Sequence, residues 1–259
     1  MVILLFKLIM TPLFIGGVTL AGRRWGPAVS GMLMGIPLTS GPISVFLALQ
    51  YGPAFAIRAG AANVAGQGSA CVFYLVYGLA ARRRPWTFCA SVSLLAFCLS
   101  TVLLNAFPWS ILSASLLLAA MILVVTRTLP HQEVPAAPAA PPRWDLPARM
   151  VVATAFVLAL TATAQELGPR LSGLIAPFPT YGVVLAAFTH RHQGGRAAAQ
   201  VVRGNAVGSV AFMTFFVIAC WGLANLHLAV AYLLSALGAV AAGSLAILAN
   251  RRAPMPSGT

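Results

Sequence analysis

Acidic residues are nearly missing from this sequence, which has only Glu133, Asp145 and Glu166 among 259 residues. Charged residues of both signs make up 7% of the chain, whereas soluble domains carry about 25%. Hydrophobic residues make up 60%. This composition excludes a soluble globular domain and predicts an all-α polytopic membrane protein. The scarcity of carboxylates also argues against a carrier of cations.

Catalytic and metal-binding motifs are missing as well. The chain has no Ser-His-Asp set, carboxylate pair, phosphate-binding loop or HExxH motif. His190 and His192 stand two residues apart in a predicted loop and are interpreted as surface residues. Four cysteines lie in apolar runs with no CxxC spacing, as small packing residues do, namely Cys71, Cys89, Cys98 and Cys220. We therefore expect no enzymatic activity, no metal and no cofactor.

Basic residues dominate the few charges, with 16 Lys and Arg and a net charge of +13. The arginines stand between apolar runs and share no common face, so they indicate membrane topology rather than nucleic-acid binding. The chain starts with an apolar run, and Arg23 and Arg24 follow it. This order is the reverse of a cleavable signal peptide, so we expect the first helix to be retained with its N-terminus outside.

Apolar runs long enough to cross a bilayer, about 20 residues each, predict nine helices. A first repeat (1–127) holds five of them and a second repeat (148–252) holds four. Between the repeats, residues 128–147 are rich in Pro and Ala and are predicted to be a cytoplasmic linker, and 253–259 form a tail. The helices are expected near 2–22, 28–49, 56–80, 86–104, 108–127, 148–166, 171–189, 197–221 and 228–249.

Loop arginines support this count because they fall on one side of the predicted membrane. The other side has only Arg58 and Arg170 near helix ends. The distribution predicts a bacterial inner-membrane protein with its N-terminus outside and its C-terminus cytoplasmic. The twelve arginines of the cytoplasmic side are Arg23, Arg24, Arg82, Arg83, Arg84, Arg127, Arg143, Arg149, Arg191, Arg196, Arg251 and Arg252.

A short motif occurs twice in the chain. Gly26-Pro27, Ser30-Gly31 and Pro37 recur 142 residues later as Gly168-Pro169, Ser172-Gly173 and Pro179, and Thr39 and Gly41 recur 141 residues later as Thr180 and Gly182. The chain is therefore interpreted as two copies of one unit. Because the first copy has five helices, the second copy enters the membrane from the opposite side. Inverted-topology repeats of this kind are a recurring plan of secondary transporters.

Residues 172–182, followed by His190 to Arg196 and a long apolar run, resemble the GlpM-type small bacterial membrane proteins. Members of that family hold one copy of the unit. This chain therefore resembles a fused duplication, and its second copy, over roughly residues 147–250, is nearer to the family pattern. The resemblance implies a multi-pass membrane architecture and implies little about activity.

The two recurring prolines are expected to interrupt the second and seventh helices, since each removes a backbone donor. In a bilayer such breaks are tolerated where protein or a water-filled cavity covers them. Either the hydroxyls beside the breaks bind the freed carbonyls, or the breaks form a solute site. The predicted site comprises Pro37, Thr39, Ser40, Pro179, Thr180 and Tyr181.

Charged and amide residues on nearby helices complete the predicted site. Arg203, about seven residues into its helix, is the expected anion-binding charge. Arg58, in the corresponding segment of the first copy, is a second candidate, and Asn205 contacts the solute or bridges helices. Glu166 is the first candidate for proton coupling.

The leading hypothesis is a membrane carrier for a small polar, anionic solute. The alternatives are a non-transporting membrane scaffold or assembly protein, and a lipid-phosphate flippase. A solute-sized cavity at Pro37 and Pro179 would favour transport, and a filled core would favour a scaffold. The expected partners are the lipid bilayer and a small solute but no nucleic acid, and a homodimer is an open alternative to a monomer.

Overall fold

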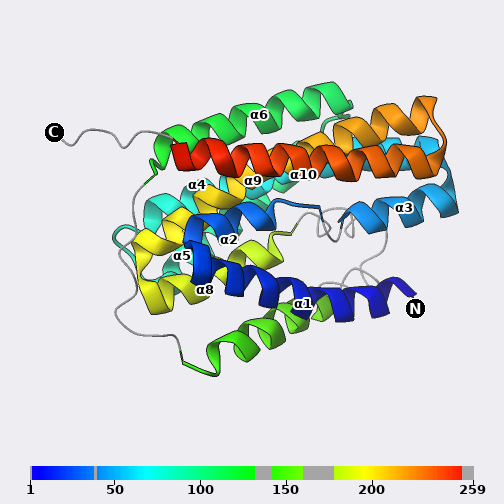
Figure 1. The fold of residues 1–259 in the computed structure, drawn as a ribbon. Coiled ribbons are helices and arrows are strands. Elements are labelled where there is room, and N and C mark those ends of the chain that lie inside the picture. The colour runs from blue at the N-terminus through cyan, green and yellow to red at the C-terminus, as the bar shows by residue number, and fades with distance from the viewer. Residues whose placement is uncertain (1, 38–39, 132–141, 160–177, 253–259) are drawn as a thin grey trace.

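A computed structural model describes residues 2–37, 40–131, 142–159 and 178–252. Every regular element within these ranges is an α-helix, which confirms the predicted all-α class. Residues 145–159 are helical in addition to the labelled helices. Figure 1 labels α1 (Val2–Trp25), α2 (Pro27–Met34), α3 (Ser40–Tyr51), α4 (Pro53–Ala80), α5 (Trp86–Asn105), α6 (Ile111–Thr128), α8 (Thr180–Gln193), α9 (Gly195–Asn225) and α10 (Leu228–Arg252).

Four of the described helices, α5, α6, α9 and α10, are long and apolar enough to cross a membrane. The most apolar stretch of α9 is 56% buried, against 17–22% for the other three. Large apolar side chains such as Leu99, Leu116 and Leu237 project outward from the poorly buried helices and are about 60% exposed. Such a surface fits lipid rather than water, so the chain is a multi-pass membrane protein.

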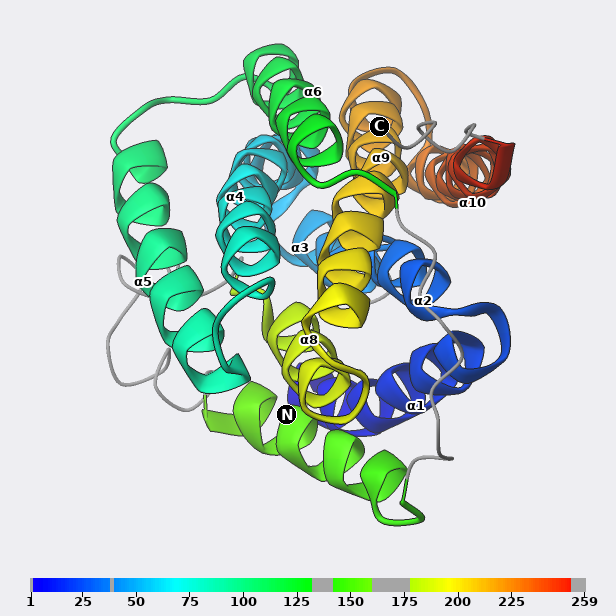
Figure 2. The ribbon, with the colours of Figure 1, turned by 90° about the vertical axis from the view of Figure 1, so that its left-hand side faces the viewer.

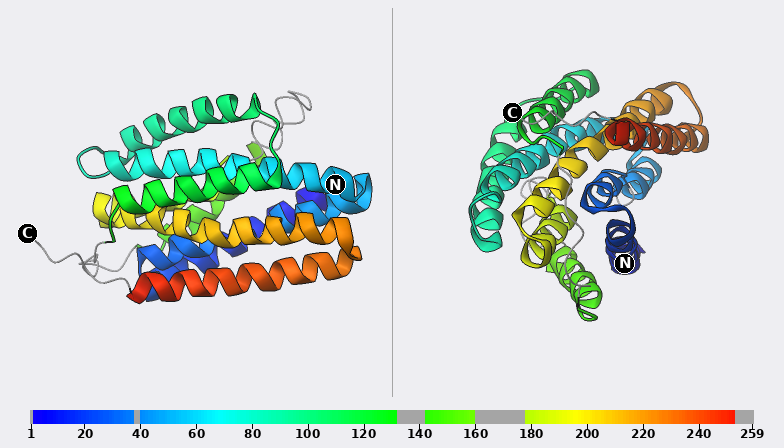
Figure 3. Two further views of the ribbon diagram at one scale, coloured as in Figure 1. Left: turned by 90° about the horizontal axis from the view of Figure 1, so that it is seen from above. Right: turned by 60° about the vertical axis from the view of Figure 1, so that its left-hand side comes forward.

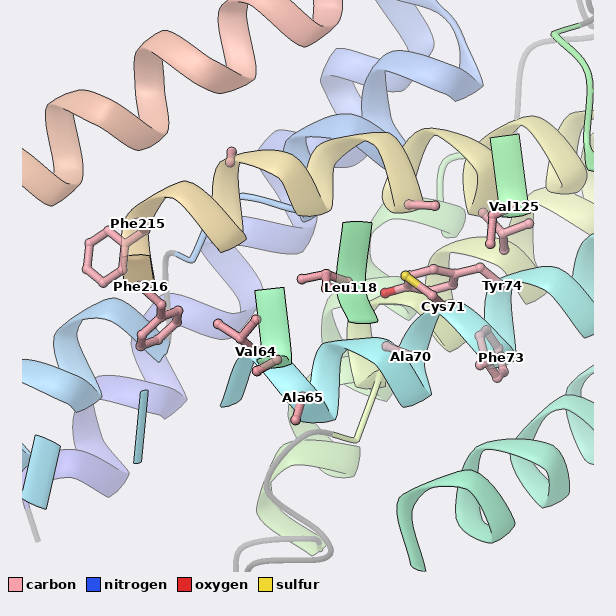
Figure 4. Close-up of a cluster of buried hydrophobic side chains, with 14 of the residues drawn as sticks. Val64, Ala65, Ala70, Cys71, Phe73, Tyr74, Leu118, Val125, Phe215 and Phe216 are labelled. Atoms are coloured by element: carbon pink, nitrogen blue, oxygen red, sulfur yellow. The ribbon is translucent and has the colours of Figure 1, made fainter. Parts of the chain in front are cut away.

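Helix α9 is the centre of the bundle. It packs against α2, α4, α6, α8 and α10, and Figure 2 shows it surrounded by them. The core between α4, α6 and α9 is closely packed, with Phe73, Leu118 and Phe216 fully buried (Figure 4). The central position of α9 brings it into contact with elements from both halves of the sequence.

The ends of α1, α4, α6, α8 and α10 and the start of α9 gather at one end of the molecule, on the left in Figure 1. Helix α1 starts at the opposite end. We call the end of the molecule where α1 ends and α9 starts the basic end. The helix ends and short connections there carry Arg23, Arg24, Arg82, Arg83, Arg84, Arg127, Arg191 and Arg196.

The helix expected over 28–49 is interrupted. Helix α2 stops at Met34 and α3 starts at Ser40, with Pro37 between them. The first hydrogen bond of the new helix runs from the Gly41 amide to the Pro37 carbonyl, 2.8 Å. The helix expected over 171–189 is described only from Phe178, and α8 begins at Thr180 directly after Pro179.

One glycine joins α3 to α4, and another joins α8 to α9. Gly52 has φ 84° and ψ 165°, and Gly194 has φ 86° and ψ 172°. Positive φ favours glycine because it has no Cβ to clash with the backbone. The two glycines are 142 residues apart, the spacing of the recurring motif. The same one-residue connection therefore leads into α4 in the first half and α9 in the second.

Helices α4 and α9 lie side by side and run in opposite directions (Figure 3). Along α4, Gly60 faces Phe216, Gln67 is hydrogen-bonded to Ser209, and Ala81 touches Gly195. The residue number on α9 thus falls as the number on α4 rises. The Gln67–Ser209 pair lies in the middle of this series, and its two members are themselves 142 residues apart.

Helices α2 and α9 approach until their backbones touch. Gly35 faces the backbone of Gly208, and Gly204 faces that of Ala28. Gly31-x-x-x-Gly35 and Gly204-x-x-x-Gly208 place small residues one turn apart on each helix, which is how helices in membranes reach close contact. The chain just before the break between α2 and α3 therefore packs directly against α9.

The predicted linker, residues 128–147, is too long at its C-terminal end because residues 145–147 are already helical. Pro147 suggested a non-helical segment. It lies in the first turn, where its missing N–H has no intrahelical partner to lose. Asp145 consequently belongs to a helix start rather than to a linker.

Candidate functional site

A cavity of about 130 Å³ lies where the break between α2 and α3 meets the start of α8. A dry cavity of about 150 Å³ holds one benzene molecule, so this one suits a solute of about six non-hydrogen atoms. The described residues that line it are Phe14, Met34, Ile36, Pro37, Ser40, Asn63, Gln67, Tyr74, Phe178, Pro179, Thr180, Tyr181, Gly182, Asn205 and Phe212.

Six residues of the predicted site line this cavity, and they come from both halves of the chain. They are Pro37, Ser40, Pro179, Thr180, Tyr181 and Asn205. Thr39 and Glu166, the latter predicted for proton coupling, lie outside the described residues. Pro37 of the first motif and Pro179, Thr180 and Gly182 of the second thus line the same space.

Two helix starts border the cavity. Ser40 is the first residue of α3, and Thr180 is the first residue of α8. The helix dipole is positive at both starts, although the Gly41 amide already donates to Pro37 and the Thr180 amide to Phe178. Gly182, in the first turn of α8, also lines the cavity. Both helix starts therefore offer positive potential to an acceptor group inside.

Two asparagines line the cavity from the long helices, Asn63 from α4 and Asn205 from α9, and they too are 142 residues apart. Asn205 is only 2% exposed. Its carboxamide forms no hydrogen bond with another described residue, although its Nδ2 lies beside Gly182. A buried amide that borders a cavity without a protein partner is poised to bond to a solute or to water.

Below the asparagines, Gln67 and Ser209 join α4 to α9. The Gln67 Nε2 donates to the Ser209 Oγ at 2.8 Å, and the Ser209 Oγ donates to the Asn205 carbonyl at 3.0 Å. Gln67 is thus an amide that bridges two helices, the alternative role that the sequence left open for Asn205. These bonds fix the spacing of the two helices beside the cavity.

Tyr181 is held by α1. Its hydroxyl lies 3.2 Å from the Thr11 Oγ1, and its ring packs edge-to-face on Phe14 with centroids 5.2 Å apart. Phe14, Tyr74 and Phe212 add aromatic walls that the sequence alone did not indicate. The cavity therefore combines polar groups with a substantial apolar surface.

The two arginines predicted for the site do not line the cavity. Arg203 is buried, 8% exposed, but it stands two residues before Asn205 on α9. Two residues rotate the direction of a helical side chain by about 200°, so Arg203 points away when Asn205 points in. Arg58 is exposed near the start of α4. Neither arginine is therefore among the described residues that line the cavity.

A second polar group of residues lies at the basic end. Asp145 accepts from Arg23 Nη2 at 3.0 Å and from Arg149 Nε at 3.0 and 3.1 Å. His192 Nε2 lies 3.4 Å from the same carboxylate. The Asp145 and Arg149 side chains are only 1% and 3% exposed. Sequence reasoning missed this cluster because Asp145 and Arg149 were assigned to linker and loop charge.

The Asp145 cluster borders a small pocket of about 20 Å³, enough for one water molecule. Thr189 lies beside Arg149, with the Arg149 Nη1 donating to its Oγ1 at 3.5 Å. The Arg149 guanidinium also covers the Phe188 ring at 5.2 Å. The cluster joins the end of α1, the start of the helix at 145–159 and the end of α8.

Comparison of the chain with protein-family models, with curated proteins and with solved structures finds no match.

Proposed function

We propose that this protein is a membrane carrier for a small polar, anionic solute, which binds in the cavity between the two helix breaks. The observation that carries the proposal is the cavity's lining. Pro37 and Ser40, at the break between α2 and α3, and Pro179 and Thr180, at the start of α8, line one space. A filled core at this place would have favoured the scaffold alternative.

We further propose that the two halves are inverted repeats related by a pseudo-two-fold axis in the membrane plane. The matching glycines Gly52 and Gly194 support this relation, because each leads into one member of the antiparallel pair α4 and α9. In the antiparallel register of α4 and α9, Gln67 and Ser209 are the two positions 142 residues apart that lie opposite each other, and they are hydrogen-bonded. A two-fold axis that relates the two halves would pass beside this pair.

Contacts of two recurring glycines support the same axis. A Cβ on Gly41 would lie 3.1 Å from Phe215, and a Cβ on Gly182 would lie 3.1 Å from Tyr74. Each glycine therefore packs on an aromatic residue of the opposite half. Such exchange of equivalent contacts is expected when two similar units face each other about a two-fold axis.

The proposed membrane orientation places the basic end in the cytoplasm of a bacterial cell and the start of α1 outside, with nine crossings in all. The arginines at the basic end support this orientation through the positive-inside rule. Kinship with the GlpM-type proteins, as a duplicated form, is part of the same proposal.

The lining favours an anion over a cation. The described lining residues include no carboxylate, and they offer two asparagines, four hydroxyls and the positive starts of α3 and α8. None of the described lining residues is charged. These helix starts and amides replace Arg203 in the anion-binding role. A small organic monoanion, such as a short carboxylate, combines an acceptor head with an apolar part for Phe14 and Phe212.

A flippase would present its cationic groups on a groove open to lipid. Arg58 is exposed but lies outside the cavity lining, and Arg203 is buried. This arrangement favours a carrier.

Thermal unfolding of the purified protein with a panel of short carboxylates tests the proposal. We expect stabilisation by at least one member, lost in Asn205→Ala and retained in Arg58→Ala, whose site lies outside the cavity. If no member stabilised the protein, or if Asn205→Ala responded like wild type, the anion site would be refuted.

A further inference from the structure

The cavity and the small pocket at the basic end lie along one seam between α1, α2 and α8. Phe14, Met34 and Tyr181 of these helices line the cavity. Thr19, Ser30 and Thr189 of the same three helices line the small pocket. Figure 2 looks along this seam from the basic end, with α1, α2 and α8 next to one another.

Apolar side chains fill the seam between the two spaces. Val18 and Leu185 are buried, and Leu33 packs against them together with Phe14 and Met34. Leu185 also lines the small pocket. We call Val18, Leu33 and Leu185 the apolar plug. The plug is only one layer of side chains, since its neighbours on one side belong to the cavity and on the other to the pocket.

The seam contains polar groups beyond the plug, which a purely structural seam does not need. The Thr19 hydroxyl is buried and has no hydrogen-bond partner among the described residues. The pocket beside it is large enough for one water molecule. A string of hydroxyls that leads from a plug to the surface is suited to hydration when the plug opens.

The Asp145 cluster closes the basic end of this seam. The carboxylate connects Arg23 at the end of α1 to the helix at 145–159 and lies 3.4 Å from His192 of α8, whereas its pair with Arg149 lies within that helix. The Arg23 bond or the His192 contact must therefore break before α8 can move from α1. A buried ion pair gains little net stability, because desolvation offsets most of the attraction. Hydration of the separated charges therefore makes this closure reversible at low cost.

We propose that the seam between α1, α2 and α8 is the solute's path from the cavity to the basic end, and that the Asp145 cluster with the apolar plug forms its gate. This inference rests on the proposed carrier function. It assigns to Asp145, Arg23 and Arg149 the task of holding the closed state rather than contacting the bound solute.

Cysteine accessibility tests the gate without any solute. In a variant whose four native cysteines are replaced by alanine, Leu185→Cys reports on the plug, and Val125→Cys is the matched control. Val125 is fully buried near the end of α6, in the core cluster and away from the seam. The probe is a membrane-impermeant maleimide, added to protein in lipid nanodiscs.

We expect Asp145→Asn to speed labelling of Cys at 185 by about tenfold, because loss of the carboxylate charge weakens its contacts with Arg23 and His192 and shifts the local opening equilibrium. Labelling at 125 should not change. Arg23→Gln is the second variant, because Arg23 is 32% exposed and its removal leaves the Asp145–Arg149 pair intact. It should act in the same direction.

Equal labelling rates at 185 with and without Asp145 would overturn the gate, and so would an equal rise at 125. Because the assay contains no solute, the outcomes separate the two proposals. Solute stabilisation with unchanged labelling would leave the carrier and remove the gate. Faster labelling at 185 alone, without stabilisation by any carboxylate, would leave the gate and remove the anion assignment.

Discussion

At the scale of single residues, the site depends on groups that enter one small space from different helices. Asn205 supplies an amide without a hydrogen-bond partner among the described residues, and Gly182 leaves room for it. Tyr181 is held in place by Thr11 and Phe14. Each of these residues can affect solute binding, protein stability or both. Conservative substitutions can separate an effect on binding from an effect on stability.

Tyr181→Phe and Thr11→Val remove the same hydroxyl contact from its two sides. Each should lower the free energy of unfolding by about 1 kcal/mol, the usual net value of a hydrogen bond. Tyr181→Phe should in addition weaken stabilisation by the carboxylate, because Tyr181 lines the cavity and Thr11 does not. Unfolding curves with and without solute measure both effects. Equal loss of solute response in the two variants would show that Tyr181 acts only through Thr11.

Gly182→Ala places a methyl group about 3 Å from Tyr74 and Asn205, closer than side chains normally pack. We expect weaker solute binding with moderate loss of stability. Gly17→Ala is the matched control, since a Cβ there meets no atom of the described residues within 4 Å. Titration of the solute against both variants measures the difference. Unchanged affinity in Gly182→Ala would place the solute elsewhere.

At the scale of elements, hydropathy predicted much of the fold. The features that it did not predict have physical causes. Most helix bounds lay within a few residues of prediction, because about 20 apolar residues in a row can only cross the bilayer as a helix. The break at Pro37 followed from the missing N–H. Hydropathy did not indicate the Asp145 cluster or the direction of the Arg203 side chain. Both depend on helix phase and on neighbours distant in sequence, which hydropathy does not encode.

Added side-chain volume should destabilise the protein most at the contact between α2 and α9. Gly208→Ala would drive a methyl group into the backbone of Met32. We expect a loss of about 2 kcal/mol, or roughly 5 °C in apparent unfolding temperature. Gly243→Ala meets only an ordinary contact with Ala211 and should be nearly neutral. Similar unfolding temperatures for the two variants would contradict the backbone contact of α2 and α9.

At the scale of the whole molecule, the arginines at the basic end set the expected orientation. Reporter fusions after Leu129 and after Arg252 should be active only as cytoplasmic reporters, since both positions follow helices that end at the basic end. These fusions test the orientation of the protein and whether the number of membrane crossings before each fusion point is odd. Periplasmic activity at either position would invalidate the proposed topology and with it the inverted relation of the two halves.

The central claim is that both halves together form one solute site that serves transport. Uptake of a stabilising short carboxylate into proteoliposomes that contain the purified protein tests it most directly. The account predicts uptake above that of protein-free liposomes, abolished by Asn205→Ala and retained by Arg58→Ala. Absence of uptake by the wild-type protein, or equal uptake by the Asn205→Ala and wild-type proteins, would contradict it.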